Sequence, residues 1–113
     1  MGRFMEKVFF WGFWGLWVLL GTYFWNDGKV YTGEWENGLL HGTGTFMWPD
    51  DKKYIGGYVD GKKLGRGKLK WPNGMTYSGD WLEGKQQGMG VLYQGDDVIV
   101  QGVWIDGNYI DDM

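Results

Sequence analysis

Aromatic residues and glycines alternate with polar residues along most of the chain, which is the pattern of β-strands with one buried face. In one such segment Tyr31, Gly33 and Trp35 share a face, while Thr32 and Glu34 share the other. Alternation with a period of two predicts a strand that is half buried.

A second alternating segment follows, and its predicted inner face consists of Gly42, Gly44, Phe46 and Trp48. Asn37-Gly38 lies between the two segments and Pro49-Asp50 closes the second one. Both pairs are typical turn sequences. Each such unit is therefore predicted to be a β-hairpin.

The hairpin pattern repeats every 23 residues. Complete units cover residues 31–53, 54–76 and 77–99, with partial units at 21–30 and 100–109. A fixed period of this length is typical of repeat architectures. The series that carry it are Gly21, Gly44, Gly67 and Gly90; Gly33, Gly56, Gly79 and Gly102; Gly38, Gly61, Gly84 and Gly107; and Trp35, Tyr58, Trp81 and Trp104.

The glycines on the strands suggest how the core is built. Glycine leaves room for a neighbouring ring or backbone, so we expect large rings to lie over glycines of adjacent strands. The sequence therefore predicts an all-β fold, an elongated, twisted antiparallel sheet of consecutive hairpins in which each hairpin is supported by its neighbours.

The repeated pattern Y-x-G-x-W-x-x-G-x-x-x-G-x-G resembles the MORN (membrane occupation and recognition nexus) repeat over about residues 21–110. The resemblance implies a twisted sheet with a groove along one side. It also implies scaffolding, membrane association or dimerisation, and no catalytic chemistry. The chain departs from the pattern at Tyr58, which replaces Trp, and at Gln94 and Val100, where aromatic residues are missing.

Residues 8–25 contain no charged side chain. The sequence GTYFW at residues 21–25 matches GTFMW at residues 44–48, so a short N-terminal hydrophobic helix would keep residues 8–20. We therefore expect residues 1–20 to form a helix and residues 21–113 to form the repeat array. Segments of this length are more often buried or interfacial helices, or signal sequences, than spanning helices.

Three interpretations of this helix remain open: a membrane anchor, a cap that is buried on the array or in a partner, and a cleaved signal peptide. An apolar surface on every side and aromatic residues at both ends favour the anchor. If the helix spans a membrane, Arg3 and Lys7 favour an N-terminus on the cytoplasmic or matrix side. The anchor would consist of Phe9, Phe10, Trp11, Phe13, Trp14, Leu16, Trp17, Val18, Leu19 and Leu20.

The chain offers little that an enzyme could use. It has no cysteine and one histidine, His41, which occupies a repeat position. The pairs of aspartates fall in turns or at the end, without the ligand spacing of a Ca²⁺ loop. We therefore predict no enzymatic activity, no catalytic or metal-binding residues and no cofactor.

Seven of the eleven Lys and Arg residues lie between Lys52 and Lys70, although the net charge is -3. Within this stretch the spacing places Arg66, Lys68 and Lys70 on one strand face, and Lys62 and Lys63 are expected in the turn before them. The basic strip is a candidate site for anionic lipids or a partner. The alternative is a solvated outer strand, and the net charge argues against nucleic acid.

The aromatic face is a second candidate surface, because rings that stay exposed usually mark partner sites. We expect a non-catalytic, membrane-associated scaffold or accessory subunit with a protein partner, and the open sheet ends would also allow a homodimer. Alternatives are a soluble interaction module with a buried N-terminal helix and a groove that binds a glycan or peptide. The groove candidates are Tyr31, Trp35, Trp48, Tyr54, Tyr58, Trp71, Tyr77 and Trp81.

Overall fold

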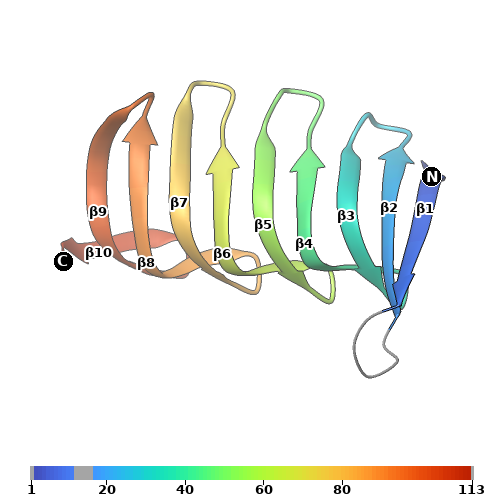
Figure 1. The fold of residues 1–113 in the computed structure, drawn as a ribbon. Coiled ribbons are helices and arrows are strands. Elements are labelled where there is room, and N and C mark those ends of the chain that lie inside the picture. Colours follow the sequence, from blue (N-terminus) through green and yellow to red (C-terminus); the bar gives the residue numbers. More distant parts are fainter. Residues whose placement is uncertain (1, 12–16, 113) are drawn as a thin grey trace.

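The computed structural model describes the backbone of residues 2–11 and 17–112 and the side chains of residues 19–112. These residues form one ten-stranded sheet in which each strand pairs with the next along the chain, and Figure 1 shows the hairpins side by side in a single row. The strands are β1 (Gly2–Trp11), β2 (Trp17–Trp25), β3 (Val30–Glu36), β4 (Leu39–Met47), β5 (Lys53–Val59), β6 (Lys62–Lys70), β7 (Met75–Leu82), β8 (Lys85–Gln94), β9 (Asp97–Ile105) and β10 (Asn108–Asp112).

All the strand pairs are antiparallel, as the hairpin pattern predicts. The turn between β3 and β4 has φ angles of 52° at Asn37 and 77° at Gly38. Two successive positive φ angles are typical of the type I′ turn, whose twist matches that of the strands it joins. The same conformation recurs at Asp60-Gly61, Glu83-Gly84 and Asp106-Gly107.

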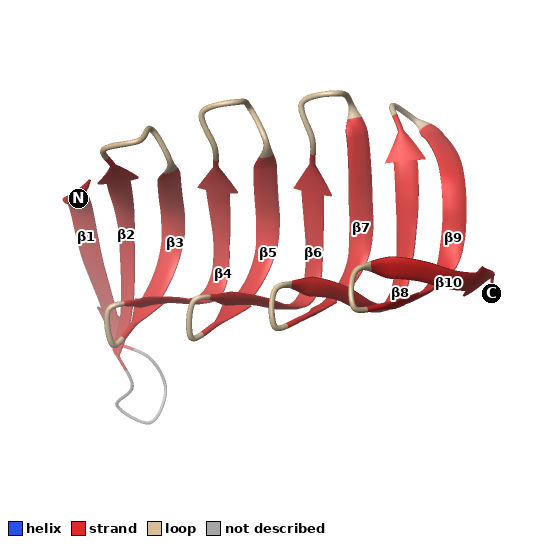
Figure 2. Cartoon of the chain, turned by 180° about the vertical axis from the view of Figure 1, so that it is seen from behind, coloured by secondary structure: helices blue, strands red, loops and turns tan. Residues whose placement is uncertain are grey.

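Each complete hairpin contains one shift of register, which bends its strands. In the first, the shift lies between Gly33 and Trp35, and Gly42 on the opposite strand has a φ of +62°. Between the pairs Gly33–Gly44 and Trp35–Leu40, three residues of β4 lie against one residue of β3. Extra residues of this kind form a β-bulge, which kinks the strand and increases its twist. Figure 2 shows from behind how the lower parts of the strands bend under the row.

Tyrosine rings packed on glycines form the centre of the core. Tyr31, Tyr54 and Tyr77 are fully buried. The hydroxyl oxygen of Tyr31 lies where it would be 2.1 Å from a Cβ atom on Gly44, and the same hydroxyl donates a 2.9 Å hydrogen bond to the carbonyl oxygen of Glu34. This packing confirms the predicted aromatic-on-glycine core.

Part of the segment in which the sequence analysis expects a helix lies in the first two strands. Residues 8–11 belong to β1 and residues 17–20 belong to β2, while residues 12–16 lie outside the described part of the chain. β2 pairs with β3 from Leu19 opposite Trp35 to Phe24 opposite Val30. The strand that begins the repeat thus extends further back than the match at residues 21–25 indicated. Within the described residues we find no helix that is long and apolar enough to cross a membrane.

Candidate binding surfaces

The inner face of the sheet carries a continuous row of aromatic rings. Successive rings meet edge to face, with centroids 5.0 to 5.6 Å apart. This arrangement is favourable because the positive edge of one ring meets the negative face of the next. The row consists of Trp35, Tyr31, Tyr58, Tyr54, Trp81, Tyr77, Trp104 and Tyr109.

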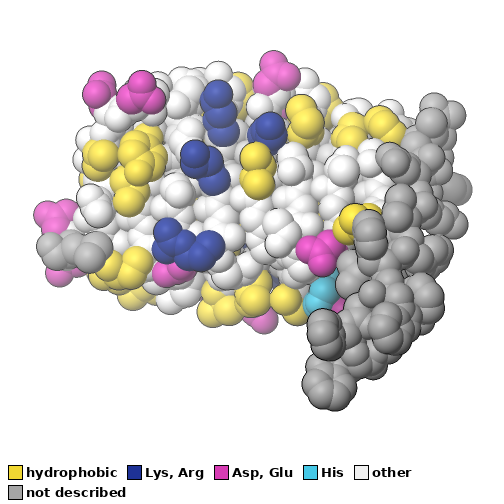
Figure 3. All heavy atoms as spheres, in the orientation of Figure 1, with side chains coloured by type: hydrophobic (Ala, Val, Ile, Leu, Met, Phe, Trp, Pro, Cys, Tyr) yellow, Lys and Arg dark blue, Asp and Glu magenta, His cyan; other side chains and the backbone are white. Residues whose placement is uncertain are grey.

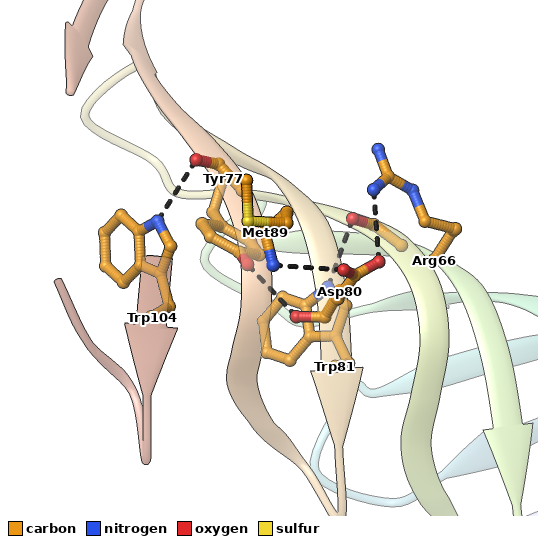
Figure 4. Close-up of polar contacts among 8 residues, drawn as sticks. Arg66, Tyr77, Asp80, Trp81, Met89 and Trp104 are labelled. Atoms are coloured by element: carbon orange, nitrogen blue, oxygen red, sulfur yellow. Dashed lines mark hydrogen bonds and ion pairs between the residues drawn. The ribbon is translucent and has the colours of Figure 1, made fainter. Parts of the chain in front are cut away.

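Tryptophan side chains link neighbouring hairpins through their indole N–H groups. Trp35, Trp81 and Trp104 each donate a 3.1 Å hydrogen bond to a glycine carbonyl oxygen 14 residues earlier. Figure 4 shows the two bonds made by Trp81 and Trp104. Tyr58 occupies the equivalent position in the second repeat, where a phenol ring has no N–H to offer.

The predicted groove residues separate into a core and a rim. Six of the eight are buried, namely Tyr31, Trp35, Tyr54, Tyr58, Tyr77 and Trp81. Trp48 and Trp71 are only partly buried and pack against that core. Sequence analysis left Trp104 and Tyr109 off the candidate surface, although the 23-residue period from Trp81 gives the position of Trp104.

The outer face carries most of the predicted basic strip. The side chains of Arg66, Lys68 and Lys70 are exposed, and so is that of Lys62. In Figure 3, Lys and Arg side chains gather over the middle of the array. Lys53, which the sequence analysis did not include, lies directly opposite Lys70 on the neighbouring strand.

Lys63 does not belong to this outer strip. β6 begins at Lys62, so Lys62 and Lys63 lie in a strand rather than in the turn where they were expected, and their side chains point to opposite faces. Lys63 pairs with Tyr58 on the inner face, while Lys62 pairs with Val59 on the outer one. The structure thus divides the five basic candidates between two surfaces.

One of the outer basic residues already has an acidic partner. Arg66 lies 3.1 Å from a carboxylate oxygen of Asp80, and the other oxygen of Asp80 accepts the backbone N–H of Met89 at 3.0 Å (Figure 4). Glu34 accepts the backbone N–H of Thr43 in the same way in the first repeat. These carboxylates therefore stabilise the bulged part of their hairpins.

The remaining outer lysines form an unneutralised cluster. Lys53 and Lys70 are cross-strand neighbours, Lys68 follows on the same face, and like charges directly opposite each other are destabilising. Among the described side chains, ion pairs join Lys29 to Asp27 and Arg66 to Asp80, and His41 contacts Glu36. None of them involves the three lysines of this cluster, which we call the basic cluster (Lys53, Lys68 and Lys70).

His41 and the acidic residues were the side chains considered for catalysis or metal binding. His41, on β4, contacts a carboxylate oxygen of Glu36 at 2.9 Å and is partly exposed. No group of three or more His, Asp or Glu residues within residues 19–112 is arranged to hold a metal ion. The candidate anchor residues before Leu19 lie outside the described side chains.

The repeat is also recognised by comparison with protein families. A family model for the MORN repeat matches residues 31–53, 54–76 and 77–97, which is more than half of the chain. The chain belongs to the MORN repeat family. A comparison with curated proteins finds no match.

The three matched MORN repeats begin at Tyr31, Tyr54 and Tyr77, the three fully buried tyrosines. The sheet continues beyond the matched residues at both ends, through β1 and β2 at one end and through β9 and β10 at the other. MORN repeats generally act as interaction modules for proteins or membranes and not as catalytic domains, which makes the two faces of this sheet its candidate functional surfaces.

Proposed function

We propose that this MORN-repeat protein is a non-catalytic, membrane-associated scaffold that docks on an anionic membrane through its outer face and holds protein partners. The observation that carries the proposal is the basic cluster. Its lysines face solvent next to one another without an acidic partner among the described residues. An anionic lipid surface would relieve this repulsion, and each basic residue near such a surface contributes about 1 kcal/mol.

The shape of the outer face suits this role. In its cross-strand rows the lysines stand beside short side chains such as Thr45 and Ser78 and beside the exposed side chain of Met47, which lies opposite Lys53. Ile55 lies opposite Lys68 and is exposed, so an apolar side chain accompanies the charges. Interfacial binding combines the same two contributions, buried apolar area and attraction to anionic headgroups.

Binding to vesicles tests the proposal. The full-length protein is expected to float with vesicles that contain phosphatidylserine and to remain behind with phosphatidylcholine alone. The Lys68→Gln/Lys70→Gln variant should bind roughly thirtyfold more weakly, because it loses two contributions of about 1 kcal/mol each. The matched control Lys29→Gln/Lys85→Gln removes the same charge elsewhere and should bind like the unaltered protein. Equal losses in both variants would refute a specific role of the cluster.

The N-terminal residues are the second part of the proposed membrane association. A membrane anchor at residues 8–20, as the sequence analysis expects, would resist extraction by alkaline carbonate, whereas attachment through the basic cluster alone would not. Full-length protein that stays in the membrane pellet after carbonate treatment supports the anchor. Release by high salt alone would restrict the association to the outer face, because salt screens exposed charges.

One observation favours a second candidate, a soluble interaction module. Leu19 packs against the aromatic core and pairs with Trp35, so part of the predicted anchor contributes to the array itself. On this alternative the N-terminal residues would complete the sheet. Full-length protein that remains entirely in the soluble fraction, with its N-terminal residues protected from protease, would favour this module over the scaffold on a membrane.

A further inference from the structure

One position on the inner face differs in character from one repeat to the next. It lies on the second strand of each hairpin, opposite the aromatic residue that stands two positions before the turn. It is occupied by Leu40, Lys63, Gln86 and Tyr109. Lys63 is the one member of this series with a charge. The second repeat therefore places a cation among the aromatic side chains of the inner face.

The ammonium group of Lys63 lies within a cage of three rings. Its nitrogen is 5.5 Å from the ring centroid of Trp48, 5.2 Å from that of Tyr54 and 5.7 Å from that of Trp81. A second ammonium, that of Lys52, lies 4.5 Å from the Trp48 centroid. Burial lowers the pKa of Lys63, and the charge of Lys52 lowers it further.

Ring faces compensate only in part for the lost hydration of a cation. Among the described side chains, neither Lys52 nor Lys63 takes part in an ion pair. Two neighbouring ammonium groups that are partly removed from water favour an anion from outside. We call this group the Lys63 cage; it consists of Lys52, Lys63, Trp48, Tyr54 and Trp81. The cage thus offers two positive charges to an anionic group of a ligand.

The next repeat has an open apolar cavity at the equivalent place. The cavity has a volume of about 250 Å³, and its lining includes Trp71, Met75, Leu92 and Trp104. Trp71 and Trp104 correspond, 23 residues on, to Trp48 and Trp81 of the cage. Gln86 stands where Lys63 stands one repeat earlier, and it leaves this space unfilled.

The cage and the cavity are one repeat apart. Two strand spacings of about 4.8 Å place their centres roughly 10 Å from each other. An extended peptide covers that distance in about three residues, and a helix covers it in about seven. Tryptophan and methionine at an exposed cavity are also typical of surfaces that bind proteins.

We propose that the inner face of the second and third repeats binds an acidic peptide segment of a partner protein, with a carboxylate at the Lys63 cage and a large apolar side chain in the cavity beside Trp71 and Trp104. The positive charge of the cage selects the acid, and the cavity selects an apolar residue about 10 Å away. This surface is distinct from the basic cluster on the outer face. A single chain can thus contact a membrane and a protein at once.

Labelled peptides test the proposal on the full-length protein. The probes carry Glu and Leu at either of the two spacings, and each has a counterpart with Gln in place of Glu; fluorescence anisotropy measures their binding. At one spacing or both, we expect the Glu peptide to bind at least about tenfold more tightly than its Gln counterpart. No preference for Glu at either spacing would overturn the proposal.

The repeats themselves supply variants that should fold. Lys63→Leu introduces the residue of the first repeat, Leu40, and should abolish the preference for Glu. Trp71→Gln introduces the residue of the last unit, Gln94, and should weaken binding of both peptides while the preference for Glu remains. If Lys63→Leu retains the preference, the cage is not the acid site.

Two further results separate this surface from the outer face. The Lys68→Gln/Lys70→Gln variant should bind the peptides normally even where it no longer binds vesicles, so failure of either proposal leaves the other standing. Binding of Lys63→Leu to phosphatidylserine vesicles should be unchanged. A loss of vesicle binding in Lys63→Leu without a loss of the peptide preference would make the cage a lipid site and contradict the inference.

Discussion

At the scale of single residues, a tyrosine ring fills the space that a side chain on the partner-strand glycine would need. A Cβ atom on Gly44, Gly67 or Gly90 would come within 2.1 to 2.2 Å of a tyrosine hydroxyl oxygen. Glycine is therefore required here by close approach and not by backbone conformation, since none of the three has a positive φ. The same contact explains why the glycine and tyrosine series share one period.

We expect Gly44→Ala to lower the free energy of unfolding by at least about 1–3 kcal/mol, the usual range for overpacking a core. The added methyl group would collide with the ring and hydroxyl group of Tyr31, which is fully buried and hydrogen-bonded to the backbone of Glu34. Urea denaturation measures the change. Thr45→Ala, on the other face of the same strand, is the control and should shift stability by about 0.5 kcal/mol or less. Equal effects would contradict the steric explanation.

The buried tyrosines also predict a loss of stability in alkali. Burial raises the pKa of Tyr77 to about 12 from its ordinary value near 10, and it raises the pKa values of Tyr31, Tyr54 and Tyr58 as well. The folded state thus keeps the neutral phenols. Their contribution to stability is complete below pH 10 and declines as the pH rises towards the folded pKa, because the unfolded chain ionises first.

The measurement is the urea midpoint as a function of pH. We expect little dependence on tyrosine ionisation below about pH 10 and a steady fall above it. Tyr77→Phe removes one titrating group and should make the fall between pH 10 and about 12 less steep, even if it lowers stability at neutral pH. An unchanged slope would show that Tyr77 does not contribute to the alkaline transition.

At the scale of strands and turns, the repeat period predicts the fold more fully than it predicts the surfaces. Side-chain alternation and the Asn37-Gly38 turn are enough to place the hairpins and the aromatic core, because both depend on local geometry. The bounds of β6 are harder to predict. An assignment of Lys62 and Lys63 to the turn leaves open which face each one joins, whereas a strand that begins at Lys62 separates them.

The N-terminal strands illustrate a second limit. A run of apolar residues without charges fits a helix and a buried strand equally well, and periodicity alone does not decide between them. The pairing of β2 with β3 decides it for residues 19–24, through partners that run from Val30 opposite Phe24 to Trp35 opposite Leu19. Lys53 was missed for the same reason, since its contact with Lys70 depends on the register between β5 and β6.

At the scale of the whole molecule, stability depends on contacts between neighbouring hairpins. The indole N–H of Trp81 binds the carbonyl of Gly67, and that of Trp104 binds the carbonyl of Gly90, so each link joins one unit to the preceding one. In such an array stability is approximately a sum of the contributions of the units and their interfaces. The array should therefore accept an additional unit if every link is reproduced.

Inserting a second copy of residues 77–99 between Ile99 and Val100 tests this additivity. The copied Trp81 would donate to the original Gly90, and Trp104 would donate to the copied Gly90, so all the indole links would be retained. We expect two additional strands and a higher urea midpoint with a larger denaturant dependence, because unfolding would expose more surface.

The control is the same insert without the copy of Ser78. That deletion puts the copied Tyr77 and Gly79 on opposite faces of the strand, and it should abolish the gain because the copied ring can no longer lie over its glycine. A gain from both inserts would mean that added length, and not the register of tyrosine, glycine and tryptophan, stabilises the array.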